Sequence, residues 1–154
     1  MAKKTQKRIV VTGNSNNNAA QNNQFVLNSQ CQSLNFLIND RTSNIHKIDT
    51  DIEELEQAIN DIDRAINGFR DAANDVEVLE AEVTQVFKGE AADAFINKII
   101  DYRSYCLKRI DHMEKLKANY SKQISDLRYQ KVLAQNLISS LRESLEKLRR
   151  SCIV

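Results

Sequence analysis

Histidine and cysteine are the residue types in this sequence that most often carry catalysis or bind metals, but their spacing supports neither role. His46 and His112 belong to no His-x-x-x-His or Glu-x-x-His pair, the spacings that place two metal ligands on one face of a helix. Cys31, Cys106 and Cys152 form no Cys-x-x-Cys pair. The three glycines stand too far apart for a phosphate-binding loop. We therefore expect no catalytic residue, no cofactor and no metal ion, in a protein that is not an enzyme.

The composition limits the folds that could position any site. The chain has 154 residues, with no proline, no tryptophan and three glycines. Folds with many turns depend on Gly and Pro, so the composition argues against barrels, sandwiches and doubly wound sheets. Hydrophobic residues make up 42% and charged residues 28% of the chain, a balance that suits long amphipathic helices. We therefore expect an all-α protein.

No feature of the sequence predicts membrane insertion or signal-peptide export. No stretch approaches the roughly 20 apolar residues that span a bilayer. The apolar run after the basic N-terminus covers only residues 9–11, whereas a signal peptide needs about 7–15 apolar residues. An odd number of widely spaced cysteines without a signal peptide favours reduced thiols. We expect a cytoplasmic protein without stable membrane insertion.

The chain changes character at about residue 25. Residues 1–24 are basic and rich in asparagine, with too little apolar surface to offset the entropy lost on ordering, so we expect a flexible tail there. Residues 25–154 are expected to form a single helical hairpin. From residue 25 onward, apolar residues recur at alternating spacings of three and four. This heptad pattern predicts a first long helix over residues 25–86.

The first predicted helix has one weak region. Ala73, Val76 and Leu79 follow one another along the heptad seam at two consecutive three-residue steps. Such a stammer predicts local overwinding of the helix near these residues. Gly68 and the acidic residues 71–75 also leave open a break in the helix at this point.

A second heptad pattern predicts a second helix over residues 91–152. The two predicted helices are equally long and flank residues 87–90. We therefore expect a long antiparallel two-helix hairpin, similar to a coiled coil, with its turn at this tetrapeptide. Basic residues at a positions weaken apolar packing but help to fix register or partner choice. The second helix has three of them: Arg103, Lys117 and Lys131.

The charge distribution favours pairing of the two helices within one chain. Residues 25–86 contain 13 acidic and 4 basic residues, a net charge of −9, whereas residues 91–154 contain 13 basic and 7 acidic residues, a net charge of +6. Opposite charges favour this pairing over association of like arms. The acidic arm would also repel phosphates, so we expect no nucleic-acid partner.

The connection between the predicted helices carries the one local motif that rises above background. Phe87 and Gly89 form an aromatic-x-Gly turn, in which Gly89 can adopt a backbone conformation closed to other residues. Ala91, Ala92 and Phe95 follow at the start of the second helix, where small residues allow close backbone approach. An ordinary helix–turn–helix corner accounts for these residues as well as a functional motif does.

This corner resembles that of the Trp-x-Gly (WXG) family of small type VII secretion proteins, above all its longer members found beside LXG toxins, with Phe87 in place of the family's Trp. The resemblance covers about residues 27–150. It implies a non-enzymatic helical hairpin that pairs with a second small WXG-like protein, or with the helical N-terminal region of an LXG-type effector that it escorts to the secretion machinery. No tyrosine has an acidic residue four positions later, so the family's Tyr-x-x-x-Asp/Glu export signal is absent. The resemblance thus implies a cytoplasmic protein, or one exported by a type VII system without a cleaved signal peptide.

Apolar residues outside the heptad seam predict a partner independently of this resemblance. A two-helix hairpin covers one stripe of each helix, so a wider apolar stripe usually faces a third or fourth helix. We therefore expect a four-helix bundle completed by another helical protein or by a second copy. The alternative function is a self-associating coiled-coil scaffold without a secretion role, in which the three basic a positions set the register of the oligomer. The candidate partner-facing residues are Phe36, Leu37, Leu107, Leu116, Val132, Leu133 and Leu137.

Overall fold

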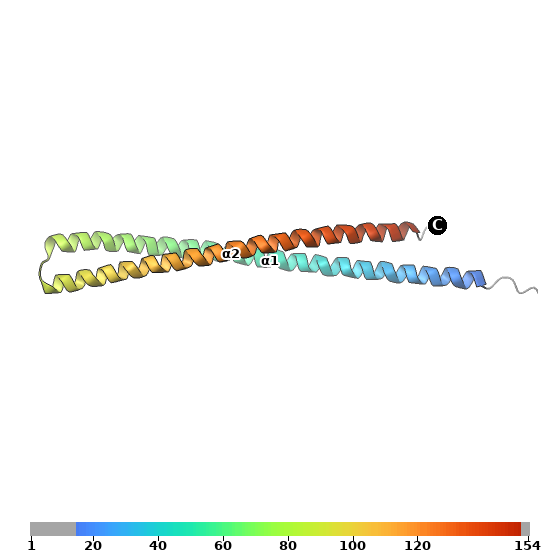
Figure 1. The fold of residues 1–154 in the computed structure, drawn as a ribbon, viewed down its shortest axis with the longest axis horizontal. Helices are drawn as coiled ribbons and strands as arrows, with labels where there is room; N and C mark the ends of the chain where they lie inside the picture. The colour runs from blue at the N-terminus through green and yellow to red at the C-terminus, as the bar shows by residue number, and fades with distance from the viewer. Residues whose placement is uncertain (1–14, 152–154) are drawn as a thin grey trace, which may run out of the picture. The chain divides into compact units, whose positions relative to one another are not determined.

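The computed structural model describes residues 15–151, which form two long helices and no strand. Helix α1 spans Ser15–Val86 and helix α2 spans Glu90–Ser151, joined by a short turn (Figure 1). The predicted all-α, two-helix hairpin is therefore confirmed, and its turn lies within the predicted tetrapeptide. The ends of α2 suit the helix dipole, because Glu90 and Asp93 lie in its first turn and two arginines lie in its last.

Helix α1 begins earlier than the sequence analysis predicts. Residues 15–24, assigned there to a flexible tail, are helical, so that assignment is wrong for their secondary structure. The side chains of residues 21–26 are all exposed, so packing does not hold that part of the helix. Extending an existing helix adds one hydrogen bond for each residue ordered, and asparagine disfavours the helix by less than about 1 kcal/mol relative to alanine. Residues 1–14 of the predicted tail and Cys152 lie outside the described residues.

The two helices contribute to two compact units. The turn unit comprises Ile45–Val132, and the terminal unit comprises Met1–Asn44 and Leu133–Val154. Each unit has its own set of buried residues along the seam between α1 and α2. In the turn unit these are Ile52, Ile66, Ala73, Val83, Ile99, Cys106 and Ile124, and in the terminal unit they are Ile38, Ile138 and Leu145.

The seam of α2 follows the predicted heptad. Every a and d position from Ala92 to Leu148 is buried or half-buried, including the three basic a positions. Among the remaining described positions of α2, Leu116 alone is not exposed. The 3.5-residue period of the apolar pattern therefore determines which face of α2 is covered.

Helix α1 keeps a regular heptad where the sequence analysis expects a stammer. The helix is continuous from residue 68 to residue 75, so no break occurs there. Leu79 is 40% exposed and Glu80 is half-buried, so the seam passes from Val76 to Glu80 and then to Val83. The predicted overwinding is wrong because the regular seam of α2 requires matching layers on α1, and this packing outweighs the burial of one apolar residue.

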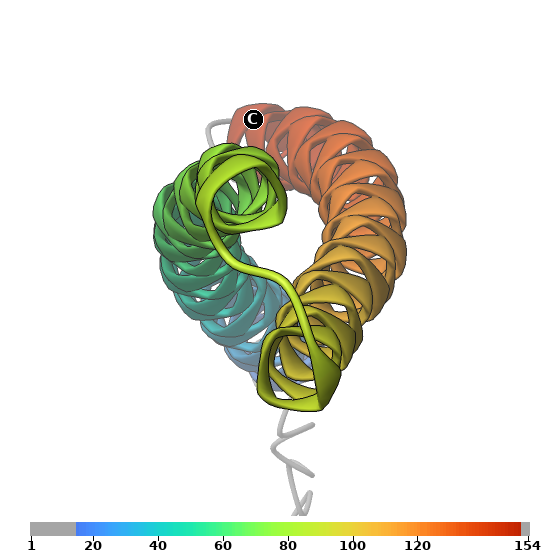
Figure 2. The same ribbon diagram turned by 90° about the vertical axis from the view of Figure 1, so that its left-hand side faces the viewer.

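The turn depends on one glycine. Gly89 has a φ of +111°, a conformation that L side chains rarely adopt. The N–H of Phe87 donates to the carbonyl of Val83 at 2.9 Å, which closes the last turn of α1, and the N–H of Asp93 donates to the carbonyl of Gly89 at 3.1 Å. Figure 2 shows the backbone crossing from the end of α1 to the start of α2 within this short segment.

Candidate partner-binding surface

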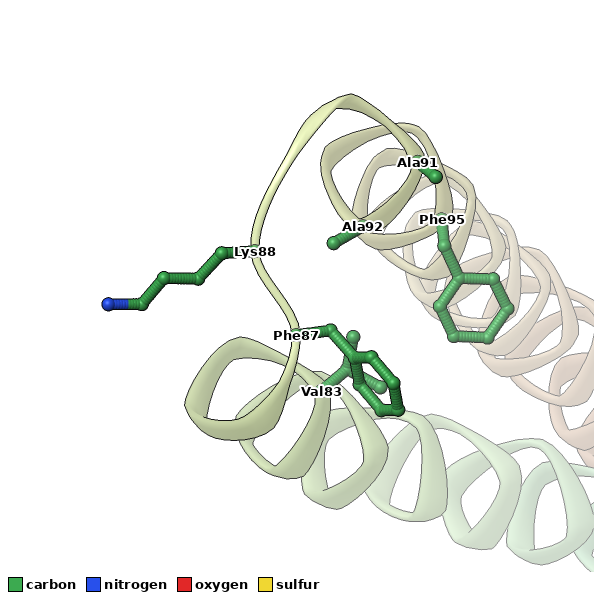
Figure 3. Close-up of a pocket in the computed structure, with 6 residues that line it drawn as sticks. All are labelled: Val83, Phe87, Lys88, Ala91, Ala92 and Phe95. Carbon is green, nitrogen blue, oxygen red and sulfur yellow. The ribbon is translucent and has the colours of Figure 1, made fainter.

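The predicted turn motif surrounds an open apolar cavity at the tip of the turn unit. The cavity has a volume of about 350 Å³ and is lined by Val83, Phe87, Lys88, Ala91, Ala92 and Phe95. The rings of Phe87 and Phe95 project into the space between the helix ends, whereas the Lys88 side chain points away from it (Figure 3). Phe87 remains 61% exposed and Phe95 47% exposed. The structure therefore brings together four of the five residues singled out in the sequence, while the fifth, Gly89, reverses the chain.

One side of the turn unit is charged and carries ion pairs between the two helices. The three basic a positions of α2 each pair with a carboxylate of α1 at an e position. A fourth pair joins two e positions directly: Arg128 of α2 pairs with Glu56 of α1, with Nη2 and Oε1 2.8 Å apart. The other three pairs are Arg103–Glu77 at 2.5 Å, Lys117–Asp63 at 2.6 Å and Lys131–Asp49 at 2.5 Å. The e positions of both helices therefore share one side of the hairpin, which we call the charged side.

The electrostatics of Lys117 follow from this pairing. Its Nζ donates a hydrogen bond to Oδ1 of Asp63, and this bond is the largest influence on its ionisation. The pKa of Lys117 is raised above its ordinary value, because the Asp63 bond and charge outweigh partial burial, which acts in the opposite direction. The lysine thus stays protonated in a seam position.

The opposite side of the turn unit is predominantly apolar. Since the e positions share one side, the g positions of both helices, which directly precede the a positions, share the other. On α1 these g positions carry Asp51, three alanines, Leu79 and Val86. On α2 they carry Phe95, Tyr102, Arg109 and Leu116, followed by Gln123 and Gln130 farther from the turn. Val86 is 73% exposed, and Leu79 and Tyr102 are 40% and 49% exposed. We call this surface the apolar side, and it consists of Ala58, Ala65, Ala72, Leu79, Val86, Phe95, Tyr102, Arg109 and Leu116.

An aromatic cluster widens the apolar side on α2. Tyr102 and Tyr105 stack with ring centroids 6.4 Å apart, and Phe69 of α1 meets Tyr105 edge-on at the same centroid distance. The guanidinium of Arg109 lies 5.0 Å from the centroid of the Tyr105 ring, within cation–π range. The neighbouring Cys106, which is fully buried, raises the pKa of the Tyr102 hydroxyl. The cluster is therefore an organised aromatic surface and not a set of scattered side chains.

The predicted partner-facing residues are divided between the two units, and those of the turn unit lie on different sides of it. Six of the seven are exposed, and Leu116 is half-buried. Leu116 lies on the apolar side of the turn unit, Leu107 lies at an e position on the charged side, and Val132 points outward at a b position. The other four, Phe36, Leu37, Leu133 and Leu137, belong to the terminal unit.

Several exposed residues of the apolar side were not predicted from the sequence to face a partner. Leu79 was expected in the seam, and Val86, Tyr102 and Tyr105 are not among the predicted partner-facing residues. Uninterrupted heptad counting through α1 would have identified Leu79 and Val86, because it places both at g positions. The same counting places Tyr102 at a g position of α2.

The described residues offer little to metal or thiol chemistry. Within residues 15–151 no group of three or more His, Cys, Asp or Glu side chains is placed to hold a metal ion. His46 and His112 are both exposed. Cys31 and Cys106 have free thiols, half-buried and buried respectively. Neither described helix is long and apolar enough to cross a bilayer.

Comparisons with known proteins add no relatives. No protein-family model, no curated protein and no solved structure matches this chain.

Proposed function

We propose that this protein is a non-enzymatic adaptor that pairs its helices with helices of a larger protein. The observation that supports the proposal is the apolar side of the turn unit, where large apolar side chains of both helices remain exposed beside a closed seam. A helix whose apolar stripe is wider than its own seam usually packs in a bundle of three or four helices. Two partner helices would cover this side and complete a four-helix bundle.

The proposed partner is a larger effector of type VII secretion. This part of the proposal comes from the WXG-like corner at Phe87 and Gly89, and the hairpin topology agrees with what that resemblance implies. The protein would act in the cytoplasm as targeting partner or secretion chaperone of an LXG-type effector, or would pair with a second small WXG-like protein. No tyrosine of these 154 residues has an acidic residue four positions later. Under this proposal, export would use the signal of the partner.

The ion pairs of the turn unit favour this function over the self-associating scaffold. The scaffold alternative assigns Arg103, Lys117 and Lys131 to contacts between copies. Each of these residues pairs with a carboxylate of α1 in the same chain. They therefore fix the register of the hairpin and require no second copy to satisfy their charge.

Affinity capture from the protein's own cells, followed by mass spectrometry, tests the proposed function. We expect the wild-type chain to retain a large protein with a long helical N-terminal region, or a second small hairpin protein. Leu79→Glu places a charge on the apolar side and should reduce this capture at least tenfold. Val78→Glu is the matched control, because Val78 is 59% exposed and points outward at an f position.

Two results would contradict the proposal. Recovery of the chain alone from wild-type cells removes the adaptor function. Equal capture by Leu79→Glu and Val78→Glu shows that the partner binds somewhere other than the apolar side.

A further inference from the structure

We infer that a second copy of this chain covers the apolar side of the turn unit when the partner is absent, with both turns at the same end and α1 of each copy lying over α2 of the other. The inference rests on the proposed role of the apolar side as a helix-docking site, and it adds a regulatory step. The effector must displace the second copy before it can bind.

The size of the side chains on the apolar side fits this arrangement. The Lys117–Asp63 pair fixes the antiparallel register, so Ala65 of α1 lies level with Leu116 of α2. By the same register, the other two alanines of α1 lie level with Arg109 and Gln123. When α2 of a second copy lies over α1 at the same height, each of these three large side chains meets an alanine, while Leu79 meets Tyr102 and Val86 meets Phe95 in apolar contacts nearer the turn. Small residues opposite large ones allow layers of a bundle to interdigitate.

Charge also selects the orientation of the second copy. The c positions that border the apolar side on α1 carry Glu54, Asp61, Asp75 and Glu82. The corresponding border of α2 carries Lys98, Tyr105, His112, Asn119 and Asp126. In the register of the hairpin, Lys98 lies level with Glu82 and Asp126 lies level with Glu54. With both turns at the same end, Glu82 of one copy faces Lys98 of the other, and Glu54 facing Asp126 is the one like-charge contact between the two borders. Reversing the second copy would place the acidic border of α1 against itself, which like-charge repulsion disfavours.

The available area is sufficient for a stable dimer. From Ala58 to Val86 the apolar side extends about 40 Å at 1.5 Å per residue, and each of its two helices is about 10 Å wide. The face therefore offers roughly 800 Å² per copy, which equals what each partner buries in an interface of standard size. Exposed aromatic side chains, which carry much of the binding energy in protein interfaces, lie within and beside it.

Mass measurement of the purified full-length chain tests the dimer. By light scattering or sedimentation at micromolar concentration, we expect twice the 17.6 kDa of one chain. Leu79→Glu should raise the dimer dissociation constant at least tenfold, whereas Val78→Glu should leave it within about twofold. Circular dichroism checks that both variants keep their helices. A wild-type monomer at these concentrations, or equal dissociation constants for the two variants, overturns the inference.

Spin-label distances test the orientation. A label at Lys88→Cys, in a chain carrying Cys31→Ser and Cys152→Ser, marks the turn, while Cys106 is buried and unreactive. Turns at the same end should give a distance between labels below about 30 Å. Turns at opposite ends of the paired turn units would separate the labels by about 60 Å, the length of about 40 helical residues, and would overturn the orientation.

The two proposals can fail separately. A monomeric purified chain that still captures an effector from cells contradicts only the self-association. A dimer that dissociates on Leu79→Glu but captures no larger protein contradicts only the adaptor function.

Discussion

Lys117 of α2 donates a hydrogen bond to Asp63 of α1 across the hairpin, with Nζ and Oδ1 2.6 Å apart. The lysine occupies an a position of the heptad, where an apolar side chain would pack more tightly. The pairs Arg103–Glu77 and Lys131–Asp49 repeat this relationship two heptads away in either direction. The repeat gives the two helices one register in which all three bonds form together, and a slip by one heptad would break all of them.

The ion pairs specify the pairing more than they stabilise it. The side chains of Lys117 and Asp63 remain 34% and 43% exposed, so solvent screens their attraction. Partly exposed pairs of this kind add little to the free energy of unfolding. A regular run of isoleucines at these positions would pack better but would accept several registers and partners. The acidic first helix and basic second helix therefore serve mainly to select each other.

Replacing the charge with an apolar side chain at this position should stabilise the hairpin. We expect Lys117→Ile to raise the free energy of unfolding by about 1 kcal/mol and the melting temperature by about 2–4 °C, since seam burial replaces a screened ion pair. Thermal and urea denaturation measure the change. Lys122→Ile is the control, because Lys122 lies on the exposed face of α2. A lower melting temperature for Lys117→Ile would show that the ion pair contributes more than the packing it displaces.

The same pair predicts how stability depends on pH. The pKa of Lys117 is raised in the folded state above its ordinary value of 10.5, so the folded chain holds this proton more tightly than the unfolded chain. The contribution is therefore fully present below pH 10.5 and is lost as the pH rises through the higher folded pKa. Denaturation between pH 9 and pH 12 should show a loss that Lys117→Met lacks. Lys117→Arg should retain its stability longer, because arginine stays charged throughout this range. Equal pH profiles for wild type and Lys117→Met would contradict the assignment.

The two described glycines should respond in opposite ways to the same substitution. A Cβ at Gly68 or at Gly89 would meet no atom within 4 Å, so only the backbone distinguishes them. Gly68→Ala lies within α1 and should stabilise the chain by about 0.5–1 kcal/mol. Gly89→Ala forces alanine to a φ of +111° and should destabilise it by about 1–3 kcal/mol. Urea denaturation of both variants measures the difference, and a neutral Gly89→Ala would show that the turn can relax to another conformation.

The heptad was sufficient to predict the hairpin, because the period of the apolar residues indicates which face of each helix is covered along most of its length. The predicted turn agrees with the structure, since Gly89 is the one position there that can adopt the required φ. The start of α1 was missed for a physical reason. Composition indicates whether a segment can bury apolar surface. A segment that continues an existing helix can become helical without any such burial.

The apolar side was harder to predict from the sequence. Treating every apolar residue as a seam residue placed Leu79 in the core and required a stammer, whereas Glu80 occupies that layer. Hydrophobicity at one position is a weaker guide than the regular register imposed by the opposite helix. When Leu79 is assigned to a g position, it lies on the same side of the hairpin as Tyr102, and the apolar side can be identified.

The tip cavity gives a final prediction that separates binding from folding. Phe87 is 61% exposed, so Phe87→Ala should lower the free energy of unfolding by less than about 1 kcal/mol. If the tip forms part of the adaptor surface, however, loss of this aromatic side chain should reduce effector capture from cells at least tenfold, as truncation of a buried interface anchor does. Phe87→Trp should capture as much effector as wild type, because the Trp-x-Gly corner that this turn resembles has Trp at this position. Lys88→Ala is the control, since Lys88 points away from the rings (Figure 3). If Phe87→Ala captures as much effector as wild type, the aromatic-x-Gly corner is only a turn, and binding must depend on the apolar side alone.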